Sequence, residues 1–222
     1  MNNELYEVIK IYSINSHKEL SNLLLGKSKD KLIALLNDLI TVYINDKNSS
    51  LLREYITVSI AGYIPNVSKI GYNGFRQETE LSGKINSCEA KPQNIISGEN
   101  KRKLNGGGNF TDYTFARLKK NLKDNPNMLI SGFVDGELLY VLEFPFKCKY
   151  FKDRLKEQLL KRFPDGDKKG EFLRSANFTF EHYKKCSGLK IIFLSKTNLI
   201  KNKQYFVNKF YEFLIDYENK KK

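Results

Sequence analysis

The chain has 222 residues and a formal net charge of +13, from 38 Lys and Arg against 25 Asp and Glu. This length suits one large α/β domain, and an apolar fraction of 41% provides for a sizeable core. The positive excess favours polyanionic partners such as nucleic acid. Three cysteines without a C-x-x-C pair argue against a disulfide framework or a zinc cluster and suit a reducing cytoplasm. Neither a signal peptide nor a membrane span is predicted, because the first residues are polar and no apolar run approaches roughly 20 residues.

The first sixty residues are predicted to form helices. Ser16 and Glu19 have the spacing of a capping box, which opens a short helix. An apolar stripe with a period of 3.6 residues after Ser28 predicts a longer helix. A further helix, capped by Ser49 or Ser50, is expected to end before the glycine at position 62. We expect these helices to form a scaffold.

A hairpin is predicted after position 69, from strands at 75–81 and 84–91 joined by a two-residue turn at Ser82-Gly83. Pro92 is expected to end the second strand. The following stretch, 92–110, is polar and rich in Gly, Lys and Arg, which predicts a mobile basic loop.

The second half alternates between helices and strands. Thr111 or Thr114 is predicted to cap a helix that ends at Asn125-Pro126. Two hydrophobic strands, 128–134 and 138–144, flank Asp135-Gly136, a favoured type I′ turn pair, and are expected to be central and covered on both faces. A basic amphipathic helix carrying Phe151, Leu155, Leu159 and Leu160, strands at 176–181 and 189–194, and a last helix at 203–217 complete the predicted elements.

Acidic side chains gather on one face of the first predicted hairpin. With the turn at Ser82-Gly83, Glu78 faces Ser87 and Glu80 faces Ile85. Residues two apart in a strand share a face, so one face is predicted to carry Glu78, Glu80, Ser87, Glu89 and Lys91. Clustered carboxylates repel one another unless a cation lies between them, which indicates a Mg²⁺ site. The metal would polarise a phosphate and lower the pKa of a bound water, and the Lys would orient that water.

Glu89-Ala90-Lys91 on a hairpin with an upstream acid resembles the active-site core of the PD-(D/E)XK nuclease superfamily, in which type II restriction endonucleases are the best-known members of this length. The resemblance is strongest over 69–146, about a third of the chain. It implies an α/β fold with a mixed central β-sheet flanked by helices. We expect a single restriction-endonuclease-like domain over 1–222, with a helical scaffold at 1–62, the catalytic core at 69–146, and C-terminal helices and strands at 147–222.

The resemblance also implies Mg²⁺-dependent hydrolysis of DNA phosphodiesters that leaves a 5′-phosphate and a 3′-hydroxyl. The implied metal ligands are Glu78, Glu89 and Ala90, and Lys91 assists the attacking water. One position departs from the family. Many members have Asp before Gly where this chain has Asn73-Gly74, and Asn offers an oxygen without a charge. Glu80, or Glu54 from the preceding helix, is an alternative to Glu78 as the upstream acid.

Basic and amide side chains after the hairpin are candidate contacts to double-stranded DNA, because Lys and Arg neutralise phosphates while Asn and Gln read adenine edges. These candidates are Gln93, Lys101, Arg102, Lys103, Asn105, Asn109, Arg117 and Lys120. No nucleotide cofactor is expected, since no Gly-Lys-Ser/Thr follows the glycines at 106–108 as in a P-loop.

We therefore expect a cytoplasmic type II restriction endonuclease, acting as a homodimer whose two-fold symmetry matches a palindromic DNA site. One alternative within the fold is a structure-specific repair or recombination nuclease. A second alternative is a basic DNA-binding protein without catalytic activity.

Overall fold

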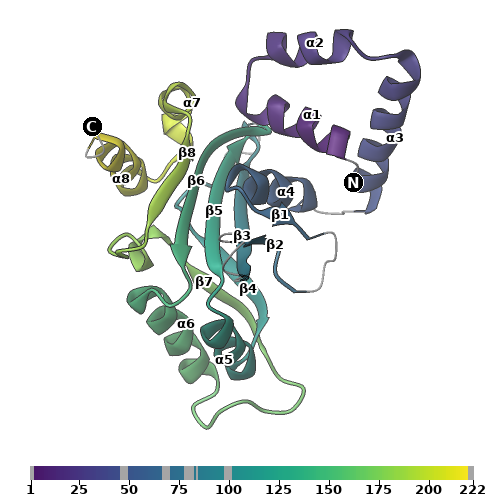
Figure 1. Cartoon of the computed structure of the whole chain (residues 1–222). Coiled ribbons are helices and arrows are strands. Elements are labelled where there is room, and N and C mark those ends of the chain that lie inside the picture. The colour runs from purple at the N-terminus through teal and green to yellow at the C-terminus, as the bar shows by residue number, and fades with distance from the viewer. Residues whose placement is uncertain are drawn as a thin grey trace.

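The computed structural model describes residues 3–45, 50–66, 71–77, 83, 85–97 and 102–219 (Figure 1). Within these ranges the fold is mixed α/β, as the sequence predicts, with a six-stranded mixed sheet in the order β1-β2-β3-β5-β6-β8. Its strands are β1 (Ile64–Pro65), β2 (Gly74–Gln77), β3 (Ile85–Ile95), β5 (Asn127–Val134), β6 (Glu137–Pro145) and β8 (Lys190–Leu194). A separate two-stranded antiparallel ribbon consists of β4 (Gly108–Tyr113) and β7 (Leu173–Phe178).

Helices precede, interrupt and follow the strands. They are α1 (Asn3–Ile14), α2 (His17–Leu25), α3 (Lys29–Asn45), α4 (Ser50–Ile60), α5 (Phe115–Asp124), α6 (Lys149–Arg162), α7 (Lys196–Lys201) and α8 (Asn208–Asn219), with short 3₁₀ turns η2 (Phe180–His182) and η3 (Lys203–Tyr205). The predicted capping box is confirmed, since Glu19 N donates to Ser16 Oγ and Ser16 N donates to a Glu19 carboxylate oxygen. None of the helices in the described ranges is both long and apolar enough to cross a bilayer.

The β5–β6 hairpin forms the centre of the sheet, as predicted. Asp135 and Gly136 both have positive φ, 49° and 82°, as a type I′ turn requires. Nearly all residues of both strands are buried, because the sheet is covered on both faces. This pair therefore provides a rigid base for its neighbours.

Strand β3 lies parallel to β5, and the chain crosses between them through β4 and α5. The predicted start of α5 is confirmed, because Thr114 Oγ1 accepts a hydrogen bond from Arg117 N. Asp167, from a distant loop, adds a second cap by accepting from two more backbone N–H groups of the first turn. The helix ends at Asn125, which adopts the left-handed conformation.

Two apolar cores lie on opposite faces of the sheet. On one face, Ile56 and Val58 of α4 pack on Leu129 and Val141. The larger core, on the other face, joins the inner face of the β4–β7 ribbon to α5, α6 and α8, and includes Phe110, Leu118, Phe144, Phe151, Phe178 and Phe210. The frame of α1, α2 and α3 lies on the opposite side of the molecule from α8 (Figure 1). Strand β3 is thus held between two packed layers.

The predicted register of the first hairpin is wrong. β2 pairs with β3 so that Phe75, instead of Glu78, lies opposite Ser87, a shift of three residues (78 − 75). The predicted turn at Ser82-Gly83 lies outside the described residues except for Gly83. The cause of the register shift is Gly74, opposite Cys88, where an added Cβ would come within 2.5 Å of a Val58 methyl and 2.9 Å of a backbone oxygen. Only glycine fits this approach, so the pairing is fixed there.

The predicted mobile loop at 92–110 is also wrong in its described parts. β3 continues through Pro92 to Ile95. Pro92 does not end the strand, for a reason that Ala90, two residues earlier, makes visible. The backbone N–H of Ala90 points away from β5, to the edge of β3 beyond the last residue that pairs with β2. Pro92 points the same way, so its missing N–H costs no ladder hydrogen bond. Farther on, Leu104 is fully buried and Gly106 and Gly107 are packed against the core.

Smaller differences concern the second half and the N-terminal helices. β7 begins and ends three residues before the predicted strand, and α8 begins at Asn208. Leu160, predicted on the apolar side of α6, is exposed, whereas the other three apolar residues of that set are buried. In α3, Leu32, Ile33 and Leu36 are exposed while Leu35 is buried, so the stripe is covered only in part.

Candidate catalytic site on strand β3

Glu89 and Lys91 lie two residues apart on β3 and share one face of the sheet, as the sequence predicts. Their side chains are in contact: Lys91 Nζ donates to Glu89 Oε1 at 2.7 Å. Arg117 Nη2 lies 3.8 Å from the same oxygen. Glu89 is only 7% exposed, so its carboxylate is held in a largely dry environment between two cations.

Lys91 is supported from the side by the β4–β7 ribbon. A Cβ on Gly108 would come within 2.8 Å of Lys91 Cβ, so glycine at this place allows the ribbon to pack directly on the Lys91 stem. The Lys91 ammonium lies 4.7 Å from the centre of the Phe110 ring, a cation–π distance. These contacts limit the positions that the ammonium can take, as a catalytic cation requires.

Arg117 was predicted as a phosphate contact, and the structure places it at Glu89. Its Nη1 donates to the Thr111 carbonyl at 2.8 Å, and its guanidinium lies 5.6 Å from the ring centres of both Phe110 and Tyr113. About 39% of its side chain is exposed. Arg117 can therefore present positive charge to solvent beside Glu89.

Asn73, at the place where the predicted resemblance would have an Asp, lies beside β3. Its Oδ1 accepts from Ala90 N at 2.8 Å, and its backbone N donates to the Cys88 carbonyl at 2.9 Å. Its Nδ2 donates to Glu54 Oε2 at 2.8 Å. The side chain thus takes the place of a strand partner for β3 and brings α4 to the site. Glu54 and Asn73 both line a cleft of about 210 Å³ between the start of α4 and the loop before β2.

Tyr72, the residue before Asn73, anchors this loop to α5. Its hydroxyl donates to Asp124 Oδ2 at 3.0 Å, and Asn121 Oδ1 lies 3.3 Å from the same hydroxyl oxygen. Burial, and next the hydrogen bond to Asp124, raise the pKa of Tyr72 well above its usual range, so it stays neutral and donating. Lys120, predicted to contact DNA, pairs with Asp124 and lies 4.9 Å from the Tyr72 ring centre, with about 65% of its side chain exposed. No role for Tyr72 was predicted from the sequence.

Two predicted DNA contacts are engaged with each other. Gln93 Nε2 donates to Asn105 Oδ1 at 2.8 Å, and Asn105 N donates back to Gln93 Oε1 at 3.3 Å. Asn105 Oδ1 also accepts from Gly107 N. Gln93 and Asn105 therefore fasten the segment before β4 to β3, and their structural role is to position the ribbon.

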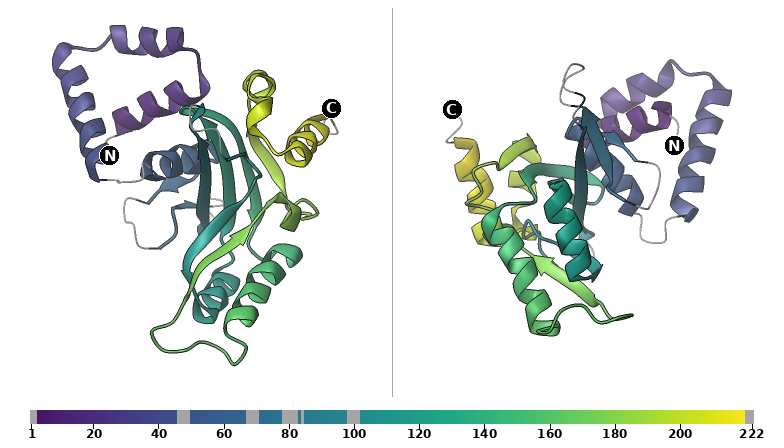
Figure 2. Two further views of the ribbon diagram at one scale, coloured as in Figure 1. Left: turned by 180° about the vertical axis from the view of Figure 1, so that it is seen from behind. Right: turned by 60° about the horizontal axis from the view of Figure 1, so that its bottom comes forward.

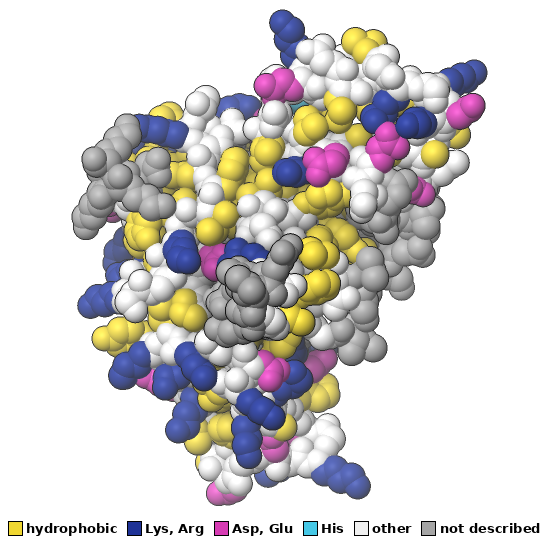
Figure 3. Space-filling model, viewed as in Figure 1, with side chains coloured by type: hydrophobic (Ala, Val, Ile, Leu, Met, Phe, Trp, Pro, Cys, Tyr) yellow, Lys and Arg dark blue, Asp and Glu magenta, His cyan; other side chains and the backbone are white. Residues whose placement is uncertain are grey.

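Three further predicted contacts lie along a groove of about 1050 Å³ that begins next to Lys91. Arg102, Lys103 and Asn109 line it, together with the exposed part of β3 and residues of β7. Arg53 of α4 is also part of the lining. Lys101 and Glu78, and the reserve acid Glu80, lie outside the described residues. Positive charge is not confined to the groove, since Lys and Arg side chains also gather over α5 and α6 (Figure 3).

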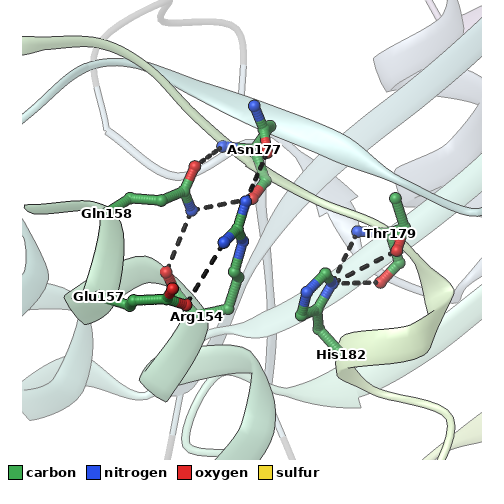
Figure 4. A network of polar contacts seen from close by, with 6 residues as sticks. All are labelled: Arg154, Glu157, Gln158, Asn177, Thr179 and His182. Atoms are coloured by element: carbon green, nitrogen blue, oxygen red, sulfur yellow. Dashed lines mark hydrogen bonds and ion pairs between the residues drawn. The ribbon is translucent and has the colours of Figure 1, made fainter. Parts of the chain in front are cut away.

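A polar network that the sequence analysis did not anticipate borders the ribbon (Figure 4). Gln158 of α6 donates to Asn177 O at 2.9 Å and accepts from Asn177 N at 3.0 Å, which satisfies the outer edge of β7. Arg154 contacts the Asn177 amide oxygen at 3.4 Å. His182 Nδ1 accepts a hydrogen bond from Thr179 N at 3.1 Å, at the start of η2. The packing of α6 against β7, which sequence periodicity does not reveal, brings Arg154 and Gln158 to Asn177.

The oxygen donors of the site fit a hard divalent cation in kind, because Mg²⁺ prefers carboxylate, amide and carbonyl oxygens. Ala90 directs its C=O to the same strand edge as its N–H, towards Asn73, while Glu89 supplies a carboxylate one residue away. Across the described ranges, however, no three His, Cys, Asp or Glu side chains are grouped to hold a metal ion. A complete ligand set therefore requires an acid from elsewhere in the chain.

No protein-family model matches the sequence, and no curated protein matches it.

Proposed function

We propose that the protein is a Mg²⁺-dependent endonuclease that cleaves double-stranded DNA, with a restriction-endonuclease-like core. The observation that carries this proposal is the arrangement at β3. A buried Glu89 contacts Lys91 at 2.7 Å, with Asn73 docked on the intervening residue and linked to Glu54. The order α4, β2, β3, α5 and β5, with β3 parallel to β5, agrees with the helix-then-strand continuation of the PD-(D/E)XK superfamily.

In this proposal each residue has a defined role. Glu89 and the Ala90 carbonyl would hold Mg²⁺, together with an acid supplied by Glu54, Glu78 or Glu80. When bound, the metal polarises the scissile phosphate and lowers the pKa of the attacking water. Lys91, fixed over the Phe110 ring, donates a hydrogen bond to that water and offsets negative charge on the phosphate.

Arg117 supports the same charge balance. It is half exposed beside Glu89 and can approach a phosphate without losing its backbone contact to Thr111. Asn73 keeps Ala90 in place through its amide oxygen. Lys91 and Arg117 together exceed the charge of Glu89 by one unit, which favours a polyanionic substrate over a neutral one.

The test is incubation of the full chain with bacteriophage DNA and either Mg²⁺ or EDTA, beside Glu89→Gln, Lys91→Met and the matched control Lys169→Met. Lys169 belongs to another acid-x-Lys sequence but is exposed. We expect Mg²⁺-dependent cleavage by the native chain and the control, and a loss of about 100-fold or more in both site variants. Equal cleavage by Lys91→Met would contradict the assignment.

We further propose that cleavage is sequence-specific and palindromic, as for a type II restriction enzyme, and that the chain acts as a homodimer. Discrete bands in the same assay would support this class, whereas a smear would not. Preferred cleavage of a branched DNA over a linear duplex would favour the structure-specific repair or recombination alternative.

A second candidate function is DNA binding without cleavage. It is favoured by the amide at Asn73 and by the pairing of the Glu89 carboxylate with Lys91 and Arg117, which leaves no negative excess in that group. Salt-sensitive DNA binding with no product in Mg²⁺ would select this function.

A further inference from the structure

The β4–β7 ribbon has two different faces. Its inner face carries Phe110, Ala176 and Phe178, each nearly or fully buried against the larger core. Its outer face carries Asn109 and Asn177, which lie opposite each other, and next to them the opposed pair Thr111 and Ser175. All four outer residues are exposed. The ribbon therefore presents two rows of side chains outward, while its other face is fixed to the core.

The composition of this outer face is unusual for the chain. Charged residues make up 28% of the sequence, yet these four positions carry only amides and hydroxyls. Asp112 and Arg174 lie at the end of the ribbon away from the groove. Asn109 Nδ2 lies 3.4 Å from Ser175 Oγ, so the neighbouring side chains are close enough to act together. Short amide and hydroxyl groups match the donors and acceptors of base edges, whereas a merely solvated face would be expected to carry Lys and Glu.

The ribbon is also placed correctly relative to the candidate catalytic site. Its first residue, Gly108, packs on Lys91, and both Asn109 and Asn177 line the groove that begins there. Arg102 and Lys103 line the same groove and can contact phosphates. Seen from behind, the two strands cross the front of the view with no helix drawn over them (Figure 2, left).

Asn177 is held in a fixed position. Gln158 forms two hydrogen bonds with its backbone, and Arg154 contacts its side-chain oxygen. The Asn177 amide nitrogen points away from α6 (Figure 4). A side chain whose oxygen is oriented by Arg154 presents its N–H₂ group in a defined direction, as a base-reading donor requires.

We infer that the outer face of the β4–β7 ribbon enters the major groove of duplex DNA and reads base edges through Asn109, Thr111, Ser175 and Asn177. A two-stranded ribbon fits the major groove, and six residues per strand span about 20 Å. The inference rests on the proposed function, because it assumes that DNA is the substrate. It assigns specificity to the ribbon and leaves Gln93 and Asn105 as positioning residues.

The experiment uses a library of duplex oligonucleotides with a randomised central region. The full chain selects from it in Ca²⁺ or EDTA, and the bound DNA is sequenced. Asn109→Ala and Asn177→Ala are compared with Asn22→Ala, an exposed amide on α2. We expect the native chain and the control to enrich the same sequence. Each ribbon variant should lose about 5- to 100-fold of its preference at one position per half-site, and should keep its salt-dependent binding to unselected DNA.

The outcomes separate the two proposals. An unchanged sequence preference in both ribbon variants, with unfolding temperatures like that of the native chain, would overturn the reading role of the ribbon. Cleavage of DNA without enrichment of any sequence would also overturn the reading role of the ribbon, but it would support the proposed nuclease function. Absence of both DNA binding and cleavage by the native chain would overturn the proposed function itself.

Discussion

Asn73 donates its side-chain amide N–H to the Glu54 carboxylate at 2.8 Å, across the space between the loop before β2 and helix α4. The same amide accepts from Ala90 N at 2.8 Å, so it needs both a donor and an acceptor atom. An ionised Asp has acceptors only. Many members of the superfamily that this sequence resembles have Asp at this place. Here a carboxylate on the neighbouring helix accompanies the amide instead, so the pair carries one negative charge.

This relationship leads to a prediction for Asn73→Asp. The substitution places two carboxylates 2.8 Å apart, so we expect the free energy of unfolding in EDTA at pH 8 to fall by about 1–3 kcal/mol. The loss should shrink as the pH falls towards 4, where the pair can share a proton, and Mg²⁺ should raise the unfolding temperature of the variant more than that of the native chain. Thermal unfolding with and without Mg²⁺ measures both effects. Asn22→Asp is the control, and an unfolding temperature unaffected by Asn73→Asp in EDTA would contradict the geometry.

Lys91→Met tests the buried ion pair through stability. The variant keeps the aliphatic stem against Gly108 but leaves the Glu89 carboxylate with Arg117, at 3.8 Å, as its cation among the described residues. We expect a destabilisation of about 1–3 kcal/mol, because a carboxylate that is only 7% exposed loses its nearer cation. Urea unfolding measures it. Lys169→Met should change stability by less than about 0.5 kcal/mol, and an equally small change in Lys91→Met would argue against this explanation.

The contact between Tyr72 and Asp124 should make the stability of the fold depend on pH in both the acidic and the alkaline range. Hydrogen bonds from Lys120 and then from Tyr72 lower the pKa of Asp124, so its stabilising contribution is present above its unfolded pKa near 4 and is lost as the pH falls below it. Burial raises the pKa of Tyr72, so its contribution is present below about pH 10 and is lost as the pH rises above it. Asp124→Asn should flatten the acidic limb and Tyr72→Phe the alkaline limb of a plot of urea midpoint against pH. Because Asp124 is largely exposed, we expect its effect to be under about 1 kcal/mol.

Gly107→Ala should be among the most destabilising single methyl additions in the chain. The new Cβ would lie 2.3 Å from the backbone oxygen of Phe178, which cannot move without breaking the β4–β7 pairing. We expect a loss of about 1–3 kcal/mol or more. Gly26→Ala is the matched control, since Gly26 has φ near −80° and nothing within 4 Å of the added atom. Equal urea midpoints for the two variants would show that the segment before β4 is not packed as described.

The salt dependence of DNA binding can distinguish two candidate DNA-binding surfaces, the groove and the basic surface over α6. Arg102→Ala and Lys103→Ala, which remove groove-lining cations, should each lower the slope of log K against log salt by about 0.9 for duplex DNA. Lys156→Ala should leave the slope unchanged, because Lys156 lies on the side of α6 opposite Arg154 and Gln158, which face the ribbon. Fluorescence anisotropy with a labelled duplex provides the measurement. A reduced slope for Lys156→Ala alone would place DNA on α6 instead.

Local features of the sequence predicted much of the fold. The box at Ser16, the cap at Thr114 and the turn at Asp135-Gly136 each depend on residues within a few positions, so the sequence contains all the information needed. The face shared by Glu89 and Lys91 follows in the same way from strand alternation. These predictions are confirmed.

Features that depend on tertiary packing could not be predicted. The register of β2 on β3 is set by the approach of Gly74 to Val58, a residue of another element, and a shift of three residues reverses the faces. Glu78 was predicted as the upstream acid because of the expected register. The observed register removes that reason, and Glu78 itself lies outside the described residues. The link between Asn73 and Glu54 likewise depends on how α4 packs, although Glu54 had been considered from the sequence.

The pairing of Gly108 with Phe178 also sets an order of assembly. β5 and β6 pair across a short turn, whereas the ribbon joins residues 70 positions apart (178 − 108), and distant pairings form more slowly than local ones. A chain still on the ribosome can contain Glu89 and Lys91 before β7 has been made. Without β7, Phe110 lacks its cover and the Lys91 ammonium lacks its fixed platform. For the proposed nuclease activity, this order means that cleavage competence should arise only once translation has passed β7, which would protect the chromosome from an incomplete enzyme.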